Sequence, residues 1–200
     1  MFDSFKPDIV FHCAAYKHVA PMQRYPREAV NTNILGTINI LEQGVKTVFV
    51  SSDKAIGSSV MGGTKKIGEL LTRQRGGIVV RFGNVLGSRG SVIPLWQESI
   101  NRGEPLNVTD KRMTRYFMTI KEACELVIEA SHGNPGEIYV LDMGEKVNVL
   151  DLAEKIIKES GKDIGIKMIG IRPGEQLEEK LMTPEEESRA IKKGKLWIIK

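Results

Sequence analysis

The chain has 200 residues and a mass of 22.3 kDa; 29 Lys and Arg against 25 Asp and Glu give a formal net charge of +4, and 41% of the residues are hydrophobic. This ordinary composition excludes a collagen, a disordered tail and a disulfide scaffold. No apolar run approaches the roughly 20 residues of a membrane helix, and the start of the chain does not resemble a signal peptide. Two cysteines predict a reducing, cytoplasmic compartment, and the dispersed basic residues do not predict a nucleic-acid interface.

Short apolar runs alternate with segments of helical periodicity in the first half of the chain, which predicts βα units around a parallel sheet. The expected strands are 9–11, 48–50 and 78–80, and all three are continuously apolar, as strands covered on both faces are. A helix is expected over 26–43, ended by Gly44. Ser58 and Ser59 are candidate N-caps of a second helix.

The second half of the chain is less regular. Its expected helices are 91–102 before Gly103, one that a capping box at 119–122 opens, one from Asn148 to Gly161, and one that a capping box at 183–186 opens. Strands are expected at 138–141 and, half exposed, at 164–168. The basic segment 192–195 is interpreted as a solvated tail, and Cys124 as part of the core.

The most specific pattern is the segment 50–65, Val-Ser-Ser-Asp-Lys-Ala-Ile-Gly-Ser-Ser-Val-Met-Gly-Gly-Thr-Lys. An expected strand delivers Ser52, Asp53 and Lys54 at its carboxyl end, where ligands of open parallel sheets bind. Met61 and Lys65 are four residues apart and therefore share one face of the following helix. An acid and two lysines thus converge near one point. The alternative is a polar loop before a helix with a surface lysine.

Several stretches together resemble one known family. They are 7–19, 33–39, 50–65, 81–94, 113–119 and the Arg-Pro-Gly-Glu of 172–175, and they follow the family's order along nearly the whole chain. The chain resembles the CapD-like polysaccharide-biosynthesis family of the extended short-chain dehydrogenase/reductase superfamily. The best-known activity of that family is UDP-N-acetylglucosamine 4,6-dehydratase.

The resemblance implies an α/β fold, namely the carboxyl-side portion of a doubly wound, Rossmann-like parallel sheet with a small α/β substrate-binding region. We expect residues 1–102 to form a truncated catalytic portion and 103–200 to form the nucleotide-sugar-binding region. Because the family interleaves the two, the boundary is not sharp.

The resemblance also assigns catalytic roles. Ser52 would hydrogen-bond the sugar near its 4-hydroxyl, Asp53 would protonate the departing 6-hydroxyl, and Lys54 would take the C5 proton. Lys65 would hold the nicotinamide ribose. The implied reaction oxidises C4 by hydride transfer to NAD or NADP, eliminates water across C5 and C6, and returns the hydride to C6.

Binding residues follow from the same matches. The expected cofactor contacts are Ala14, Ala15, Lys17 and Lys65. The expected contacts to the UDP-sugar are Asn84, Ser91, Arg115, Arg172 and Glu175, with the guanidinium of Arg172 suited to phosphate.

The sequence departs from the family pattern at two places. Met61 occupies the position of the superfamily's catalytic tyrosine, and a thioether cannot take a proton from a hydroxyl. The base for C4 is therefore unassigned, with Asp53 and Lys54 as candidates. The sequence also contains no G-x-G-x-x-G turn for a pyrophosphate, and it begins where the family's fourth strand begins.

The strand at 8–12 is therefore expected at a sheet edge, and unpaired edges invite pairing with another chain. We expect a second copy or a separate chain that supplies further strands; a fragment or gene remnant is the alternative. No metal site is expected, because Cys13 points away from His12 and no third ligand accompanies His12 and His18. Two other functions stay open: a nucleotide-sugar epimerase, and a non-catalytic UDP-sugar-binding subunit.

Overall fold

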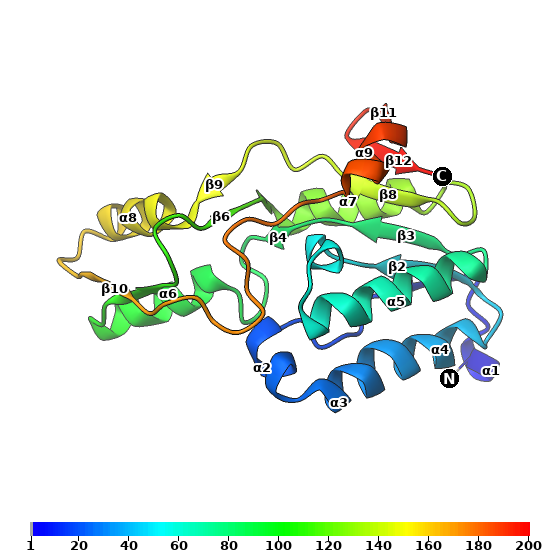
Figure 1. Ribbon diagram of the computed structural model, residues 1–200, viewed down its shortest axis with the longest axis horizontal. Coiled ribbons are helices and arrows are strands. Elements are labelled where there is room, and N and C mark those ends of the chain that lie inside the picture. Colours follow the sequence, from blue (N-terminus) through cyan, green and yellow to red (C-terminus); the bar gives the residue numbers. More distant parts are fainter. Residues whose placement is uncertain (1) are drawn as a thin grey trace.

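A computed structural model describes residues 2–200 and shows a mixed α/β molecule built on one six-stranded sheet (Figure 1). The strand order is β1 (Ile9–His12), β2 (Lys46–Val50), β3 (Ile78–Arg81), β8 (Ile138–Leu141), β12 (Leu196–Ile199) and β11 (Ile191–Lys193). The first four strands are parallel, and the last two are antiparallel to their neighbours. The expected α/β class and the parallel, Rossmann-like sheet are confirmed.

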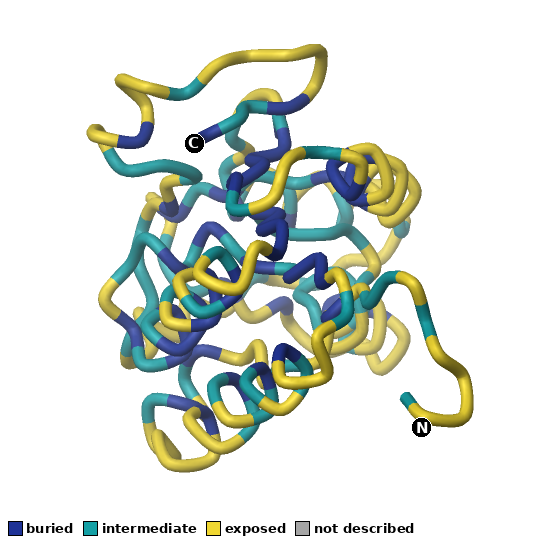
Figure 2. Tube along the Cα trace, turned by 90° about the vertical axis from the view of Figure 1, so that its right-hand side faces the viewer, coloured by how far each residue is buried: buried dark blue, intermediate teal, exposed yellow. Residues whose placement is uncertain are grey.

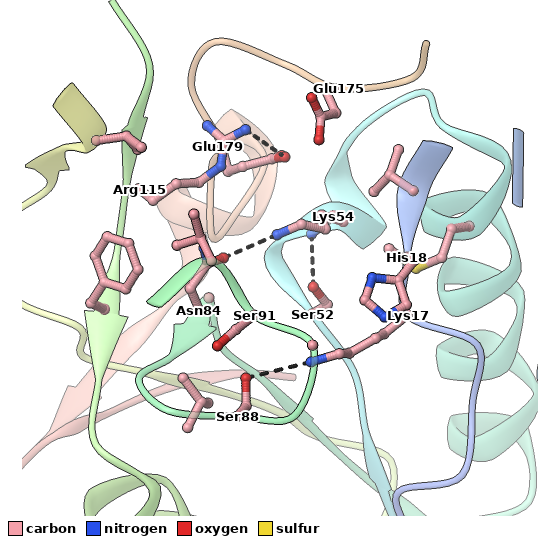
Figure 3. A pocket seen from close by; sticks show the side chains of 18 of the residues that line it. Lys17, His18, Ser52, Lys54, Asn84, Ser88, Ser91, Arg115, Glu175 and Glu179 are labelled. Atoms are coloured by element: carbon pink, nitrogen blue, oxygen red, sulfur yellow. Dashed lines mark hydrogen bonds and ion pairs between the residues drawn. The ribbon is translucent and has the colours of Figure 1, made fainter. Parts of the chain in front are cut away.

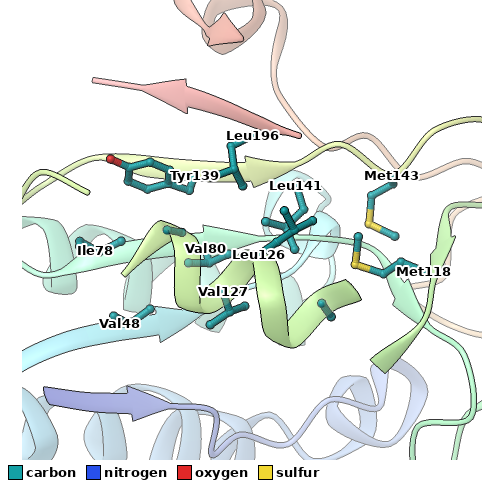
Figure 4. Close-up of a cluster of buried hydrophobic side chains, with 12 residues drawn as sticks. Val48, Ile78, Val80, Met118, Leu126, Val127, Tyr139, Leu141, Met143 and Leu196 are labelled. Atoms are coloured by element: carbon teal, nitrogen blue, oxygen red, sulfur yellow. The ribbon is translucent and has the colours of Figure 1, made fainter. Parts of the chain in front are cut away.

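Helices cover both faces of this sheet. One face carries α5 (Val60–Gln74) and, packed against α5, α2 (Val19–Arg24), α3 (Pro26–Ala29) and α4 (Gly36–Leu41). The opposite face carries α7 (Ile120–Ala130), whose buried Leu126 and Val127 pack with Val48 and Val80 from the strands (Figure 4). Alternate strand residues, such as Phe49 and Val79, belong to a second core cluster. Two-sided burial is the reason that these strands are continuously apolar.

The caps predicted from the sequence are formed. Ser59 Oγ accepts the Gly62 N–H, Thr119 and Thr183 each form a capping box, and Asn148 accepts two N–H groups at the start of α8 (Val149–Ser160). Gly103 and Gly161 close their helices in the left-handed conformation. The helix after Thr183 is short, α9 (Pro184–Arg189).

The helix expected over 26–43 is interrupted by a π-helical segment, η1 (Val30–Leu35), between α3 and α4. Asn33 lies within this π-helical segment and its side chain is buried. Its Oδ1 accepts a hydrogen bond from the Tyr16 N–H, and its Nδ2 donates to the Tyr16 carbonyl. Asn33 also donates to Thr64 of α5. Amphipathic spacing alone does not distinguish this segment from an α-helix.

Two expectations about the second half need correction. The segment 192–195 is exposed, as expected, but it is not a tail: Lys192 and Lys193 belong to β11, a turn at Gly194 leads to β12, and β12 pairs with β8 inside the main sheet. The hairpin is hard to recognise in the sequence, because its lysines give it the composition of an exposed segment and only Leu196 and Ile199 are buried. Cys124 is exposed, because α7 turns Ala123 and Val127 toward the sheet instead.

A smaller lobe stands beyond the carboxyl ends of the strands. Helices α6 (Val92–Arg102) and α8 enclose β5 (Leu106–Val108) and β10 (Ile166–Met168), which pair in parallel. The expected division near residue 102 stays a prediction; β8, β12 and α7 all come from the later half yet belong to the main sheet layer.

Short elements complete the chain. They are α1 (Phe2–Phe5), η2 (Asp53–Ile56), β4 (Asn84–Val85), β6 (Thr114–Arg115), β7 (Phe117–Met118) and β9 (Val147–Asn148). Within residues 2–200, β1 pairs with β2 alone, so it forms one edge of the sheet. Figure 2 shows the buried residues concentrated at the centre and exposed residues on the outer helices and loops. No helix of residues 2–200 has the length and apolarity to cross a membrane.

Candidate active site

A cavity of about 420 Å³ lies between the carboxyl ends of β1, β2 and β3 and the smaller lobe. Parallel sheets bind their ligands at this end. One wall comes from the loops after the three strands and from Met61 and Lys65 of α5. The opposite wall comes from β5, β6 and the loop that contains Arg172 and Glu175.

The loop after β2 presents the polar centre of the cavity (Figure 3). Ser52 N-caps the short helix η2: its Oγ accepts the Lys54 N–H at 3.2 Å and donates to Asp53 Oδ1 at 2.8 Å. Lys54 Nζ donates to Asp53 Oδ1 at 2.9 Å and to Asn84 Oδ1 at 3.3 Å. Ser52, Lys54 and Asn84 all line the cavity.

Asp53 lies behind this loop, not on the cavity wall. Its side chain is 0% exposed and it is not among the lining residues. Oδ1 holds Ser52 and Lys54, whereas Oδ2 is buried without a hydrogen bond, near Gly83. The resemblance gave no indication that this carboxylate reaches the cavity only through its neighbours.

Met61 and Lys65 line the cavity from α5, as their spacing predicts. Lys65 Nζ donates to the Val50 carbonyl at 2.8 Å and lies 4.7 Å from the centre of the Phe49 ring. Burial lowers the pKa of Lys65 to about 8. A buried ammonium with one backbone acceptor keeps donors free for a ligand hydroxyl.

Of the three expected cofactor contacts after β1, two line the cavity and one does not. Ala15 and Lys17 line the cavity, but Ala14 is exposed and does not. Lys17 Nζ reaches across to Ser88 Oγ at 3.4 Å, and burial lowers the pKa of Lys17. His18 lines the same side, whereas His12 is buried against Thr37 Oγ1 at 2.9 Å. Among residues 2–200 no group of three His, Cys, Asp or Glu side chains is arranged to hold a metal ion.

All five expected substrate contacts line the cavity: Asn84, Ser91, Arg115, Arg172 and Glu175. Their side chains are engaged differently. Arg172 pairs with Glu175, while the guanidinium of Arg115 donates to the carbonyls of Thr114, Gln176 and Leu177. Arg115 therefore positions the 176–177 segment. Ser91 Oγ is buried without a hydrogen-bond partner among the described residues.

Sequence reasoning missed the buried cavity carboxyl Glu179. It is 4% exposed, lines the cavity and has its Oε1 3.8 Å from Arg115 Nη2. Burial raises the pKa of this carboxyl. Its neighbour Glu178 is exposed. Two consecutive glutamates give no sequence signal that tells the inward side chain from the outward one.

An ionic cluster lies directly behind the loop that contains Ser52. Arg81 is fully buried on β3 and donates to Glu69 of α5 at 2.7 Å and to Glu186 of α9 at 2.8 Å. Ser51 Oγ donates to Glu69 at 2.6 Å. Burial acts to raise the pKa of Glu186, but hydrogen bonds from Arg81 outweigh it and lower the value to about 2. This cluster fixes the backbone just before Ser52.

The fold and the site together define a Rossmann-like α/β domain with a cavity at the carboxyl ends of its parallel strands. The chain belongs to the polysaccharide biosynthesis protein family, whose sequence profile matches residues 1–200. The predicted resemblance to the CapD-like proteins is thereby confirmed.

Particular relatives support this assignment. The capsular polysaccharide biosynthesis protein CapD of Staphylococcus aureus is 48% identical, over 93% of this chain and 34% of CapD. A UDP-glucose 4-epimerase of Rickettsia rickettsii is 39% identical, over 90% of this chain and 58% of the epimerase. The X-ray structure of Pen from Bacillus thuringiensis is 41% identical with a TM-score of 0.92, covering 96% of this chain and 66% of Pen. The chain thus spans about a third of CapD and less than two thirds of the epimerase.

Proposed function

We propose that this cavity binds a UDP-sugar and a nicotinamide dinucleotide, NAD or NADP, and that it catalyses 4,6-dehydration of the sugar for cell-surface polysaccharide synthesis. The observation that carries the proposal is the Ser52–Asp53–Lys54 array, in which a base on the cavity wall is hydrogen-bonded to an acid directly behind it. Elimination of water needs one group to take a proton and another to give one.

The array can supply both the proton acceptor and the proton donor that the elimination of water needs. A proton that moves from Lys54 Nζ to Asp53 Oδ1, 2.9 Å away, leaves a neutral amine facing the cavity and a protonated carboxyl behind it. The amine then takes the proton from C5. Asp53 returns its proton through Ser52 Oγ, which lines the cavity and lies 2.8 Å from Oδ1, to the departing 6-hydroxyl. Ser52 is the contact through which the buried acid acts.

The cofactor fits the residues on the α5 side. Lys65 of α5 lines the cavity and has free ammonium donors for a ribose diol. When bound, the dinucleotide supplies the hydride acceptor and donor. Met61 has no ionisable proton, so it forms an apolar wall and leaves proton transfer to the array after β2.

The test is incubation of the chain with UDP-N-acetylglucosamine and NAD+ or NADP+, followed by mass spectrometry. Loss of one water from the sugar is the expected product, and Lys54→Ala should abolish it while UDP still binds. An isomer of unchanged mass would favour the epimerase alternative, which the identity to the rickettsial enzyme supports. Binding of the UDP-sugar without conversion would favour a non-catalytic subunit. Either result contradicts the dehydratase proposal.

The expectation of a partner also stays a proposal. Edge strand β1 carries Phe11, which is 41% exposed, and its outer hydrogen-bonding groups have no strand beside them within residues 2–200. Such an edge is suited to strand addition by a second copy or another chain.

A further inference from the structure

The backbone fixes Asn84 beside the acid of the catalytic array. Asn84 begins β4, which pairs in parallel with β7, and its N–H donates to the Tyr116 carbonyl at 3.1 Å. The preceding Gly83 lies against the buried Asp53: a Cβ at Gly83 would be 3.1 Å from Asp53 Oδ2 and 3.1 Å from Tyr116 Cβ. The chain therefore passes Asp53 at close range just before it presents the Asn84 side chain to the cavity.

The Lys54 ammonium is held between two oxygens. Nζ donates to Asp53 Oδ1 at 2.9 Å and to Asn84 Oδ1 at 3.3 Å, the contact that Figure 3 draws across the site. An ammonium only donates, so the Asn84 amide must turn its oxygen toward it. The two acceptors belong to one connected unit, because the Asp53 N–H donates to the carbonyl of Phe82, two residues before Asn84, at 3.0 Å.

Two acceptors on one side are what an amine base requires. When Asp53 takes a proton from Lys54, the neutral amine that forms keeps two N–H groups and one lone pair. With its N–H groups directed at Asp53 Oδ1 and Asn84 Oδ1, the lone pair is directed away from both oxygens, into the cavity that Lys54 lines. With one acceptor the amine would be free to turn about that single hydrogen bond.

The second acceptor must also be neutral. A carboxylate at this distance would stabilise the ammonium form and oppose the transfer of its proton to Asp53. An amide oxygen accepts from the amine and from the ammonium without adding a charge. Asparagine is therefore suited to orient Lys54 without holding its proton.

We propose that Asn84 is a positioning residue for Lys54, whose amide oxygen turns the lone pair of the neutral amine toward the cavity. The inference rests on the proposed dehydration, and it gives Asn84 a task other than contact with the UDP-sugar. The two tasks are separable. A substrate contact sets the affinity for the UDP-sugar, whereas a positioning residue sets the turnover and the reactivity of the amine.

The first experiment measures the Lys54 amine itself, without substrate. Trace acetylation with acetic anhydride across a pH series, read by peptide mass spectrometry, follows the fraction of neutral amine. Asn84→Asp keeps the size and the acceptor but adds a charge, so the pH midpoint of labelling should rise by about one unit or more. The neighbouring charges, Lys17 and the Glu179–Arg115 pair, are the same in both chains.

The second experiment measures turnover and affinity. Asn84→Ala should lower kcat about tenfold or more, while the Kd for UDP-N-acetylglucosamine changes less than about threefold. Asn84→Asp should also lower kcat about tenfold, because the added charge disfavours the proton transfer to Asp53. In Asn84→Asp, but not in Asn84→Ala, the basic limb of the pH profile should move to higher pH. A merely structural role for Asn84 would not produce this difference.

The matched control is Asn101→Asp, the same charge change at an exposed position of α6 that does not line the cavity. It should leave the labelling midpoint and kcat unchanged. An unmoved midpoint in Asn84→Asp, or a full kcat with weakened sugar binding in Asn84→Ala, would overturn the assignment. If the natural chain removes no water, the proposed function fails, while the labelling still decides whether Asn84 controls the amine. Circular dichroism establishes that each variant is folded.

Discussion

At the scale of single residues, the most informative feature is that Asp53 is screened from the cavity by Ser52. The motif predicts that Ser52 and Asp53 each contact the sugar and have separate roles there. In the structure they form one unit, because Asp53 Oδ1 accepts from both Ser52 Oγ and Lys54 Nζ. In the reaction that we propose, the hydroxyl of Ser52 would then act as a proton carrier and not only as a sugar contact.

This arrangement predicts a particular ranking of substitutions. Asp53→Asn and Ser52→Ala should each lower kcat about 100-fold or more, the usual scale for loss of a general acid or base, with the Kd for UDP changed less than about threefold. Ser52→Thr retains the hydroxyl and should recover most of the activity. Steady-state kinetics and titration with UDP measure both quantities. A Ser52→Ala variant that keeps its full kcat would exclude the relay.

At the scale of elements, α5 approaches the η2 turn so closely that a side chain cannot fit between them. A Cβ at Gly62 would lie 2.0 Å from the Lys54 carbonyl oxygen. At the next residue, Gly63, nothing lies within 4 Å of such a Cβ. The Gly-Gly pair of the motif thus contains one glycine required by packing and one that is not.

The two glycines offer a matched pair of substitutions in the same helix. Gly62→Ala should destabilise the fold by about 1–3 kcal/mol and impair turnover, because η2 and Lys54 must move away. Gly63→Ala should be neutral or stabilising by up to about 1 kcal/mol, since alanine favours the helix. Urea denaturation and product formation report on both variants. Equal losses at the two positions would show that the close approach does not govern the site.

At the scale of the whole molecule, the buried Arg81 cluster ties α9 to the centre of the sheet. Arg81 of β3 binds Glu69 of α5 and Glu186 of α9, residues separated by more than half of the chain. Such a cluster destabilises strongly when one partner is lost, because a charge is left buried without compensation.

The cluster predicts a defined acid dependence. The pKa of Glu186 in the folded chain, about 2, lies below its ordinary value of 4.5, so its contribution is present above pH 4.5 and is lost as the pH falls toward 2. Glu186→Gln should cost about 3 kcal/mol at pH 7, and the difference from the natural chain should shrink below pH 4.5. Denaturant unfolding across this range measures it. Exposed Glu187→Gln is the control and should have no effect at any pH.

Much of this molecule is readable in the sequence. The four parallel strands, the caps and the lining of the cavity by Ser52, Lys54, Met61 and Lys65 follow from apolar runs, capping residues and one motif. The features that the sequence does not predict depend on the direction of individual side chains and on contacts between residues far apart in the chain. Lys192 and Lys193 obscure β11, and β12 is recognisable as a strand only through its pairing with β8. No local pattern shows that Asp53 turns inward or that Glu179 turns into the cavity.

The position of β12 has a consequence for the order of events during synthesis. Strand β8 lies between β3, made about 60 residues earlier, and β12, made about 55 residues later. While the ribosome is still translating residues 142–195, the apolar edge of β8 has no neighbour on one side. The nascent protein therefore passes through an interval in which that edge is open to wrong pairing, and the interval ends only when Leu196–Ile199 emerge.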